Sequence, residues 1–168
     1  MELDWPICVH IGHGSPAFES IAGRDGAGFN RFISDSPNYL AFSVLLNSQL
    51  PAKFPSLRFG FFESGCTWVA AATQTALHIR LKPEDLMQRV QEKLAEHNFY
   101  VTCELHEDLP NIIRYTGEDR LMAGSDYGHP GDIADTIMYR DQLAERGDLA
   151  TRVQDKLLSA NPLGLFRL

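Results

Sequence analysis

Four short runs of apolar residues recur along the chain, separated by longer segments in which apolar and polar positions follow a helical spacing. Each run is rich in β-branched or aromatic residues and ends at or beside a polar residue or a glycine, which is typical of a strand buried on both faces. The predicted strands are Ile7–Ile11, Leu57–Glu63, Phe99–Glu104 and Arg120–Asp126.

The segments between these strands predict helices, of which Pro83–His97 is the clearest. It places Leu86, Met87, Val90 and Leu94 on one face and carries Glu84 and Asp85 in its first turn, where the helix dipole favours acidic side chains. A second helix is predicted over Pro37–Leu50, with Ser36 as the N-cap, Pro37 at the first helical position and an end before Pro51. Further helices are predicted over Cys66–Ile79, His106–Tyr115, Ile133–Arg146 and Leu149–Ser159.

Strands that alternate with helices indicate βαβ units and a parallel sheet, so the fold class is α/β. The 168 residues, 44% of them apolar, are enough for one domain with a substantial core. Gly12–Asp35 is the one long irregular stretch, and loops of this length in compact domains are usually functional.

The composition of the chain argues against some kinds of binding partner and location. The net charge is −7 and no two of the 15 basic residues are adjacent, which argues against binding to nucleic acid. No apolar run approaches the roughly 18–20 residues of a membrane span, and the acidic first residues do not resemble a signal peptide. Three cysteines without a CxxC pair favour the cytosol, with Cys8 and Cys103 as small buried thiols in strands.

The candidate chemistry lies at the ends of the predicted strands. In parallel α/β folds reactive groups gather at the carboxyl ends of the strands, and here these ends carry His10, Glu63, Glu104 and Asp126. Imidazole and carboxylate groups can hold a divalent metal ion that activates water or polarises a carbonyl group. The pattern therefore predicts metal-assisted hydrolysis or decarboxylation, with Asp126 placed to take a proton from the water.

Each of these residues also has a purely structural interpretation. His10 can be a hydrogen-bonded core histidine, and Glu63 can stabilise the N-terminus of the following helix. Glu104 can be a solvated carboxylate at a helix start, and Asp126 can initiate an Asx turn. A doubly wound nucleotide-binding fold is disfavoured, because no GxGxxG follows a strand and no GxxxxGK[ST] occurs.

Four stretches of the sequence resemble the C-terminal half of the amidohydrolase-related family, the group that includes aminocarboxymuconate-semialdehyde decarboxylase. They are CVHIGHG (8–14), FPSLRFGFFESGCTW (54–68), GEDRLMAGSDYGHP (117–130) and LLSANPLGLF (157–166). The resemblance implies that residues 1–168 form strands 5 to 8 of a TIM-type (β/α)8 barrel, about four βα units with parallel strands.

The resemblance also implies roles for individual residues. His10 would be the metal-binding histidine of the fifth strand, and Asp126 the aspartate of the eighth strand that binds the metal and takes part in catalysis. Glu63 occupies the catalytic position of the sixth strand, where many members have a histidine. His129 matches a histidine that is common after the aspartate and would contact the substrate. His13 is a second candidate for substrate contact, and both can instead be loop residues without a ligand. The implied cofactor is a divalent metal, zinc in the first place and manganese as the alternative.

The sequence departs from the family pattern because the His-x-His pair of the first barrel strand is missing. Four strands cannot close a barrel, so two sheet edges and an apolar inner face are expected to be open. We therefore expect part of a metal-dependent hydrolase or decarboxylase for a small carboxylated or amide-like substrate, completed by a missing N-terminal half or by a homo-oligomer. The alternative is a non-catalytic half barrel that serves as a binding or oligomerisation module.

Overall fold

The computed structural model describes residues 3–11, 31–78, 80–126 and 139–168, with the backbone alone for residues 31–33. Its centre is a four-stranded sheet in which all neighbouring strands are parallel and lie in the order β1-β2-β3-β4. The strands are β1 (Ile7–His10), β2 (Phe59–Phe62), β3 (Phe99–Cys103) and β4 (Leu121–Ala123). The predicted α/β class with parallel strands is thereby confirmed.

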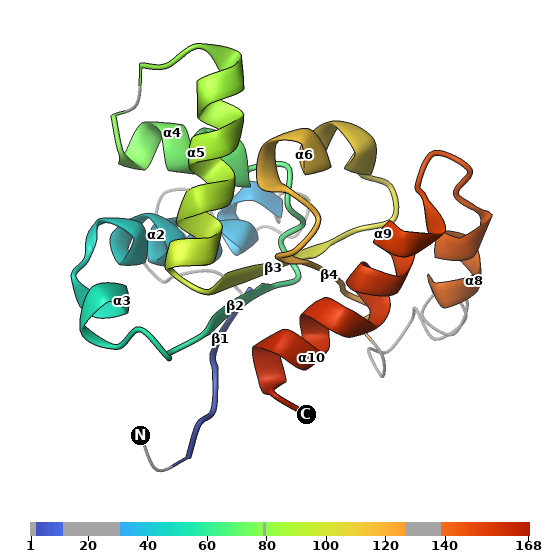
Figure 1. Cartoon of the computed structure of the whole chain (residues 1–168), viewed down its shortest axis with the longest axis horizontal. Helices are drawn as coiled ribbons and strands as arrows, with labels where there is room; N and C mark the ends of the chain where they lie inside the picture. The colour runs from blue at the N-terminus through green and yellow to red at the C-terminus, as the bar shows by residue number, and fades with distance from the viewer. Residues whose placement is uncertain (1–2, 12–30, 79, 127–138) are drawn as a thin grey trace, which may run out of the picture.

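Helices cover one face of this sheet, and the C-terminal helices run across the other (Figure 1). In the described ranges no helix is long and apolar enough to cross a membrane. The helices are α2 (Arg31–Asn47), α3 (Leu50–Lys53), α4 (Val69–Ala76), α5 (Pro83–Glu96), α6 (Leu109–Thr116), α8 (Tyr139–Glu145) and α9 (Thr151–Asp155), followed without a break by the π-helical η1 (Lys156–Ala160) and by α10 (Asn161–Phe166).

The main core lies between the sheet and the helices α2, α4, α5 and α6. Alternate strand residues point into it, and Phe59, Phe61 and Phe99 meet there with ring centroids 5.3 to 5.5 Å apart. From α5 the core receives Leu86, Val90 and Leu94, as the helical spacing predicted. Burying such aromatic and aliphatic side chains stabilises each by roughly 1.5–3 kcal/mol, which makes this face the main source of stability.

The opposite face of the sheet is covered in part by α10. Leu165 is fully buried there against Tyr100 and Met122. Asn161 at the start of α10 donates hydrogen bonds of 2.7 Å to the carbonyl groups of Glu118 and Leu121, which attaches the helix to β4. The expectation of a wholly open inner face is therefore wrong, because the segment LLSANPLGLF folds back over it.

Strand β1 is an exposed edge strand. The prediction that all four strands are buried on both faces is wrong here, since only Val9 of the four residues is even half-buried. The prediction of a buried Cys8 thiol is wrong for the same reason, whereas Cys103 is buried as predicted. In the part of the chain that the structure describes, β1 has β2 on one side and no strand on the other.

The start of α2 also differs from the prediction. The helix begins at Arg31, so Pro37 lies inside it and Ser36 is a buried helical residue rather than an N-cap. Packing of α2 against α4 and the sheet outweighs the backbone hydrogen bond that Pro37 cannot make. The predicted loop Gly12–Asp35 therefore ends earlier; its residues 12–30 lie outside the described ranges. Similarly, the closing helical segment extends to Phe166 instead of Ser159.

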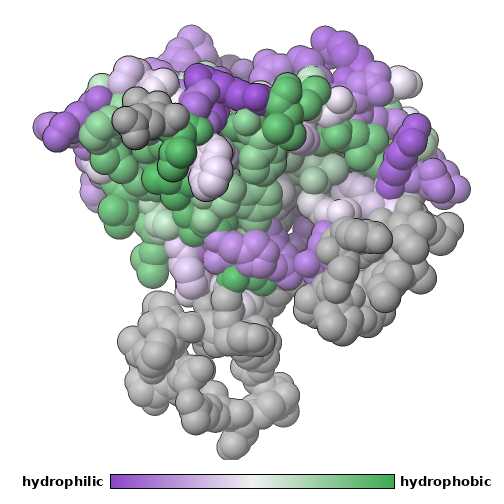
Figure 2. Space-filling model, turned by 90° about the horizontal axis from the view of Figure 1, so that it is seen from below, coloured by the Kyte–Doolittle hydropathy of each residue, from purple (hydrophilic) through white to green (hydrophobic). Residues whose placement is uncertain are grey.

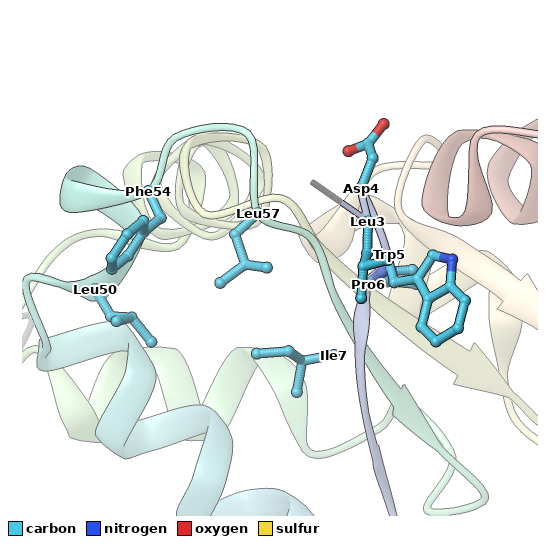
Figure 3. A pocket seen from close by; sticks show the side chains of 8 residues that line it. All are labelled: Leu3, Asp4, Trp5, Pro6, Ile7, Leu50, Phe54 and Leu57. Carbon is cyan, nitrogen blue, oxygen red and sulfur yellow. The ribbon is translucent and has the colours of Figure 1, made fainter. Parts of the chain in front are cut away.

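A groove lies beside the first residues of β1. It has a volume of about 590 Å³, and Figure 3 shows Ile7, Leu50 and Leu57 converging on it while the Asp4 carboxylate points away. Seen from below, Figure 2 shows hydrophobic side chains gathered over much of one side of the molecule. Trp5, with 72% of its surface exposed, and Leu3, with 67%, are among the most exposed large apolar residues. A large apolar patch on a folded chain marks a surface that normally meets another surface.

Candidate active site at the carboxyl ends of the strands

The carboxyl ends of β1 and β2 bring His10 and Glu63 together. His10 is the last residue of β1 and stands in register with Phe62, so Glu63 follows directly on the neighbouring strand. The His10 Nε2 atom lies 3.0 Å from Oε2 of Glu63. The other ring nitrogen, Nδ1, lies 2.7 Å from the carbonyl oxygen of Ile11, which accepts the hydrogen bond from an N–H on that nitrogen.

This arrangement suits a metal ligand. Ligating histidines usually donate the second ring N–H to a carbonyl or carboxylate, as His10 Nδ1 does, and present the remaining nitrogen to the ion. Glu63 Oε2 lies 3.0 Å from the other ring nitrogen, Nε2. A carboxylate at this distance stands beside the position that an ion bound to Nε2 would take, which suits the catalytic role predicted for Glu63.

Within the described ranges no group of three or more His, Cys, Asp or Glu side chains forms a cluster that could hold a metal ion. Asp126 lies three residues after the end of β4, at the far edge of the four strands. In a flat sheet three strand spacings of about 4.8 Å amount to roughly 14 Å, so a shared ion requires the sheet to curve as in a barrel. His13 and His129 lie outside the described residues, and their substrate-binding roles stay predictions.

Both candidate catalytic carboxylates have an unusual backbone. Glu63 has φ of 65° and Asp126 has φ of 50°, in the left-handed region that non-glycine residues rarely adopt. Such strained residues persist only where their surroundings hold them, and they are concentrated at functional sites. Asp4, His78, Asn98 and Arg167 share this backbone conformation, so it is compatible with a functional role for Glu63 and Asp126 but does not by itself assign one.

Thr102 supports both of these carboxylate loops and was missed in the sequence. Its hydroxyl oxygen accepts a hydrogen bond of 2.9 Å from the Glu63 amide. On its other side Gly124 passes so close that a Cβ atom there would lie 3.0 Å from that of Thr102, which explains the glycine in GSDYGHP. A threonine inside the otherwise apolar run FYVTC was the available signal, because buried polar residues usually have a specific partner.

Glu104 and Glu107 follow β3 and differ in role. Glu104 is half-buried and lies 3.4 Å from Nδ1 of the exposed His106, which leaves it at the rim. Glu107 is buried, and its two carboxylate oxygens accept hydrogen bonds from the amides of Cys66, Thr67 and Glu104. In the sequence Glu107 is one charge among several in a row, whereas in the structure it holds the loops after β2 and β3 together.

The fold and the site define a class of protein: a parallel α/β half barrel with imidazole and carboxylate groups at the carboxyl edge of its strands. The family model described as amidohydrolase matches residues 1–168, and the chain belongs to that family. The resemblance found in the sequence is thereby confirmed. Comparison with curated proteins gave no match.

Solved structures show the same fold. An amidohydrolase from Mycobacterium avium subsp. paratuberculosis K-10 superimposes with a TM-score of 0.68 at 22% sequence identity, over 98% of this chain and 43% of that chain. A 5-carboxyvanillate decarboxylase from Sphingomonas paucimobilis has a TM-score of 0.64 at 16% identity, over 98% of this chain and 50% of that one. This chain thus spans about half the length of the structures that it matches.

A third structure is a dihydroxybenzoic acid decarboxylase from Polaromonas sp. JS666, with bound manganese and the inhibitor 2-nitroresorcinol. Its TM-score is 0.69 at 18% identity, and the match covers 99% of this chain and 51% of that chain. At these identities the comparisons establish the fold alone. They place the four strands described here in one half of a larger architecture.

Proposed function

We propose that this chain supplies the C-terminal half of the barrel of a metal-dependent hydrolase or decarboxylase that acts on a small carboxylated or amide-like molecule. The observation that carries the proposal is the contact of 3.0 Å between His10 Nε2 and Glu63 Oε2 at the carboxyl edge of parallel strands. The family match and the two decarboxylases among the structural neighbours support it.

In this proposal His10 and Asp126 hold the divalent ion, which is zinc or manganese. Such an ion lowers the pKa of a bound water to about 7 and polarises a substrate carbonyl group. Asp126, three residues after β4, would take a proton from the reacting water, and Glu63 would occupy the second catalytic position, beside His10. Glu63 is half-buried and Asp126 is exposed, so a substrate can reach both carboxylates. Assays with carboxylated aromatic acids and with amides as substrates distinguish decarboxylation from hydrolysis.

The partner that completes the site is also proposed. The open edge of β1 and the groove beside it, lined by Trp5, Ile7 and Phe54 among others, suit the packing of a further βα unit. A parallel strand could pair with β1 along the side where the described residues supply no strand, and a helix would fill the groove. We therefore propose a complementary half barrel as the partner. If light scattering shows that the chain is a dimer, the second half of the barrel is another copy of this chain instead.

Calorimetric titration with Mn²⁺ and Zn²⁺ tests the metal site. We expect His10→Ala and Asp126→Ala to weaken binding by at least about tenfold, since each removes a ligand. His106→Ala is the matched control, because this histidine is exposed and lies in the loop after β3, two strands away from β1. Unchanged binding after His10→Ala would contradict the proposal. A folded chain that binds neither metal, alone or with the complementary half, would favour the non-catalytic module.

A further inference from the structure

Asn38 reaches from helix α2 to the residues on both sides of Glu63. Its side-chain amide donates a hydrogen bond of 2.7 Å to the carbonyl oxygen of Phe62 and another of 2.8 Å to the hydroxyl of Ser64. Asn38 is fully buried, and Ser64 is 6% exposed. One side chain thus spans the residue that the site depends on, from a helix 25 positions earlier in the sequence.

The backbone at Glu63 needs such support. Its φ of 65° is a conformation in which a non-glycine residue is strained, so the turn after β2 would relax if nothing held it. The Glu63 amide is fixed by Thr102 at 2.9 Å, and the Phe62 carbonyl before it and the Ser64 hydroxyl after it are fixed by Asn38. The three hydrogen bonds come from two different elements, β3 and α2.

Asn38 makes these contacts at a cost to itself. Its carbonyl oxygen Oδ1 is buried and has no hydrogen-bond partner among the described residues. Exchanging the positions of oxygen and nitrogen would bring Oδ1 against the carbonyl oxygen of Phe62, so the present orientation is the one the surroundings dictate. A buried unsatisfied acceptor in a native fold calls for an explanation, and the two donated bonds provide one.

We propose that Asn38 is a positioning residue that holds Glu63 in its left-handed conformation and thereby directs its carboxylate at His10 Nε2. This inference concerns the site of the proposed function and rests on that function for its catalytic meaning. The contact between Glu63 and His10 can nevertheless be measured without metal or turnover. Failure of one proposal is therefore distinguishable from failure of the other.

The test compares the ring nitrogen signals of His10 by NMR, at one fixed pH, in the 168-residue chain and its variants. Asn38→Asp is nearly isosteric and replaces the donating amide group by a second acceptor. We expect it to move the His10 Nε2 signal in the same direction as Glu63→Gln does, and to add little in the Glu63→Gln background. Asn47→Asp is the matched control, since Asn47 lies on the same helix and donates to the carbonyls of Ser43 and Ala76.

An unchanged His10 signal in folded Asn38→Asp would overturn the proposal, as would equal shifts from Asn38→Asp and Asn47→Asp. If Asn38→Asp does not fold, Ser64→Ala takes its place, because it removes only one of the two acceptors. A smaller shift in the same direction supports the proposal, and no shift refutes it. In the active assembly we expect Asn38→Asp to lower kcat about tenfold and to leave KM within about twofold.

Discussion

The carboxylate of Glu107 accepts a hydrogen bond of 2.8 Å from the backbone amide of Cys66, 41 residues earlier in the chain. The same carboxylate accepts hydrogen bonds from Thr67 and Glu104, so the loops after β2 and β3 share one buried anchor. Since the candidate site stands on these loops, their rigidity depends on a residue that has no chemical role of its own.

Glu107→Gln should therefore destabilise the chain by about 1–3 kcal/mol. The glutamine amide group would face a backbone donor in place of a carboxylate oxygen, which leaves one buried N–H group unsatisfied. The free energy of unfolding in urea measures the effect. Glu145→Gln is the control, because Glu145 is exposed, and we expect a change within about 0.5 kcal/mol. Equal effects of the two changes would refute the anchoring role.

Gly65→Ala should be costly for two reasons. Gly65 has φ of +62°, and a Cβ atom there would lie 2.7 Å from Oε1 of Glu107. The left-handed backbone alone costs an alanine about 1–2 kcal/mol, and the short contact adds to it. Gly147→Ala is the matched control, since nothing lies within 4 Å of its added Cβ. Thermal unfolding of both variants measures the difference, and a Gly65→Ala protein as stable as Gly147→Ala would contradict the geometry.

The three cysteines should differ in their reaction with a thiol reagent. Cys8 is exposed on the edge strand, whereas Cys66 and Cys103 are buried. Burial raises the pKa of the Cys66 thiol. It also raises the pKa of the Cys103 thiol, to about 12, so neither forms the reactive thiolate in the folded chain. We expect one thiol to react under native conditions and the remaining two only in denaturant. Rapid reaction of all three would show that the core around Cys66 opens.

The stability of the chain should depend on pH through His97. The ring follows α5 and packs against Phe99 with centroids 5.2 Å apart, and burial lowers its pKa from 6.5. Above pH 6.5 the ring is neutral in both states. As the pH falls, His97 takes up a proton in the unfolded chain before it does so in the folded chain, so the free energy of unfolding decreases. The decrease stops once the pH is below the pKa of His97 in the folded chain.

His97→Gln removes this titration and is its test. The unfolding free energy of the parent chain relative to His97→Gln should be greatest above about pH 7 and should decrease toward about pH 5, by about 1.4 kcal/mol for each unit of pKa shift. Urea unfolding at several pH values measures the difference. A difference that stays constant over this range would exclude His97 as the source.

The elements that the sequence predicted well are those whose pattern reflects local burial. All four strands and α5 lie where periodicity places them, because alternate residues such as Phe59 and Phe61 face a helix layer in the same chain. The burial of β1 was mispredicted. An apolar run indicates that a strand can be buried, but it does not indicate whether another strand or helix is present to cover it. Pro37 was read as a helix start, although long-range packing carries α2 through it.

The sequence predicted the candidate catalytic and metal-binding residues, but not the residues that hold them in place. His10 and Glu63 could be found because they end apolar runs and match a family pattern, and the structure does bring them into contact. Asn38 and Thr102 escaped detection, because each acts through a hydrogen bond to backbone far away in the sequence. No spacing rule links a helix residue to the loop after the next strand. Only the fold reveals such support.

The sheet order β1-β2-β3-β4 follows the order of the strands in the chain, with each return made by a crossover. Every strand is therefore laid beside its predecessor in the sheet. A chain built in this way can be divided between two units without any strand having to be withdrawn from its neighbours. The same connectivity permits two separately synthesised polypeptides to dock laterally, so that division of one barrel between two genes raises no topological obstacle.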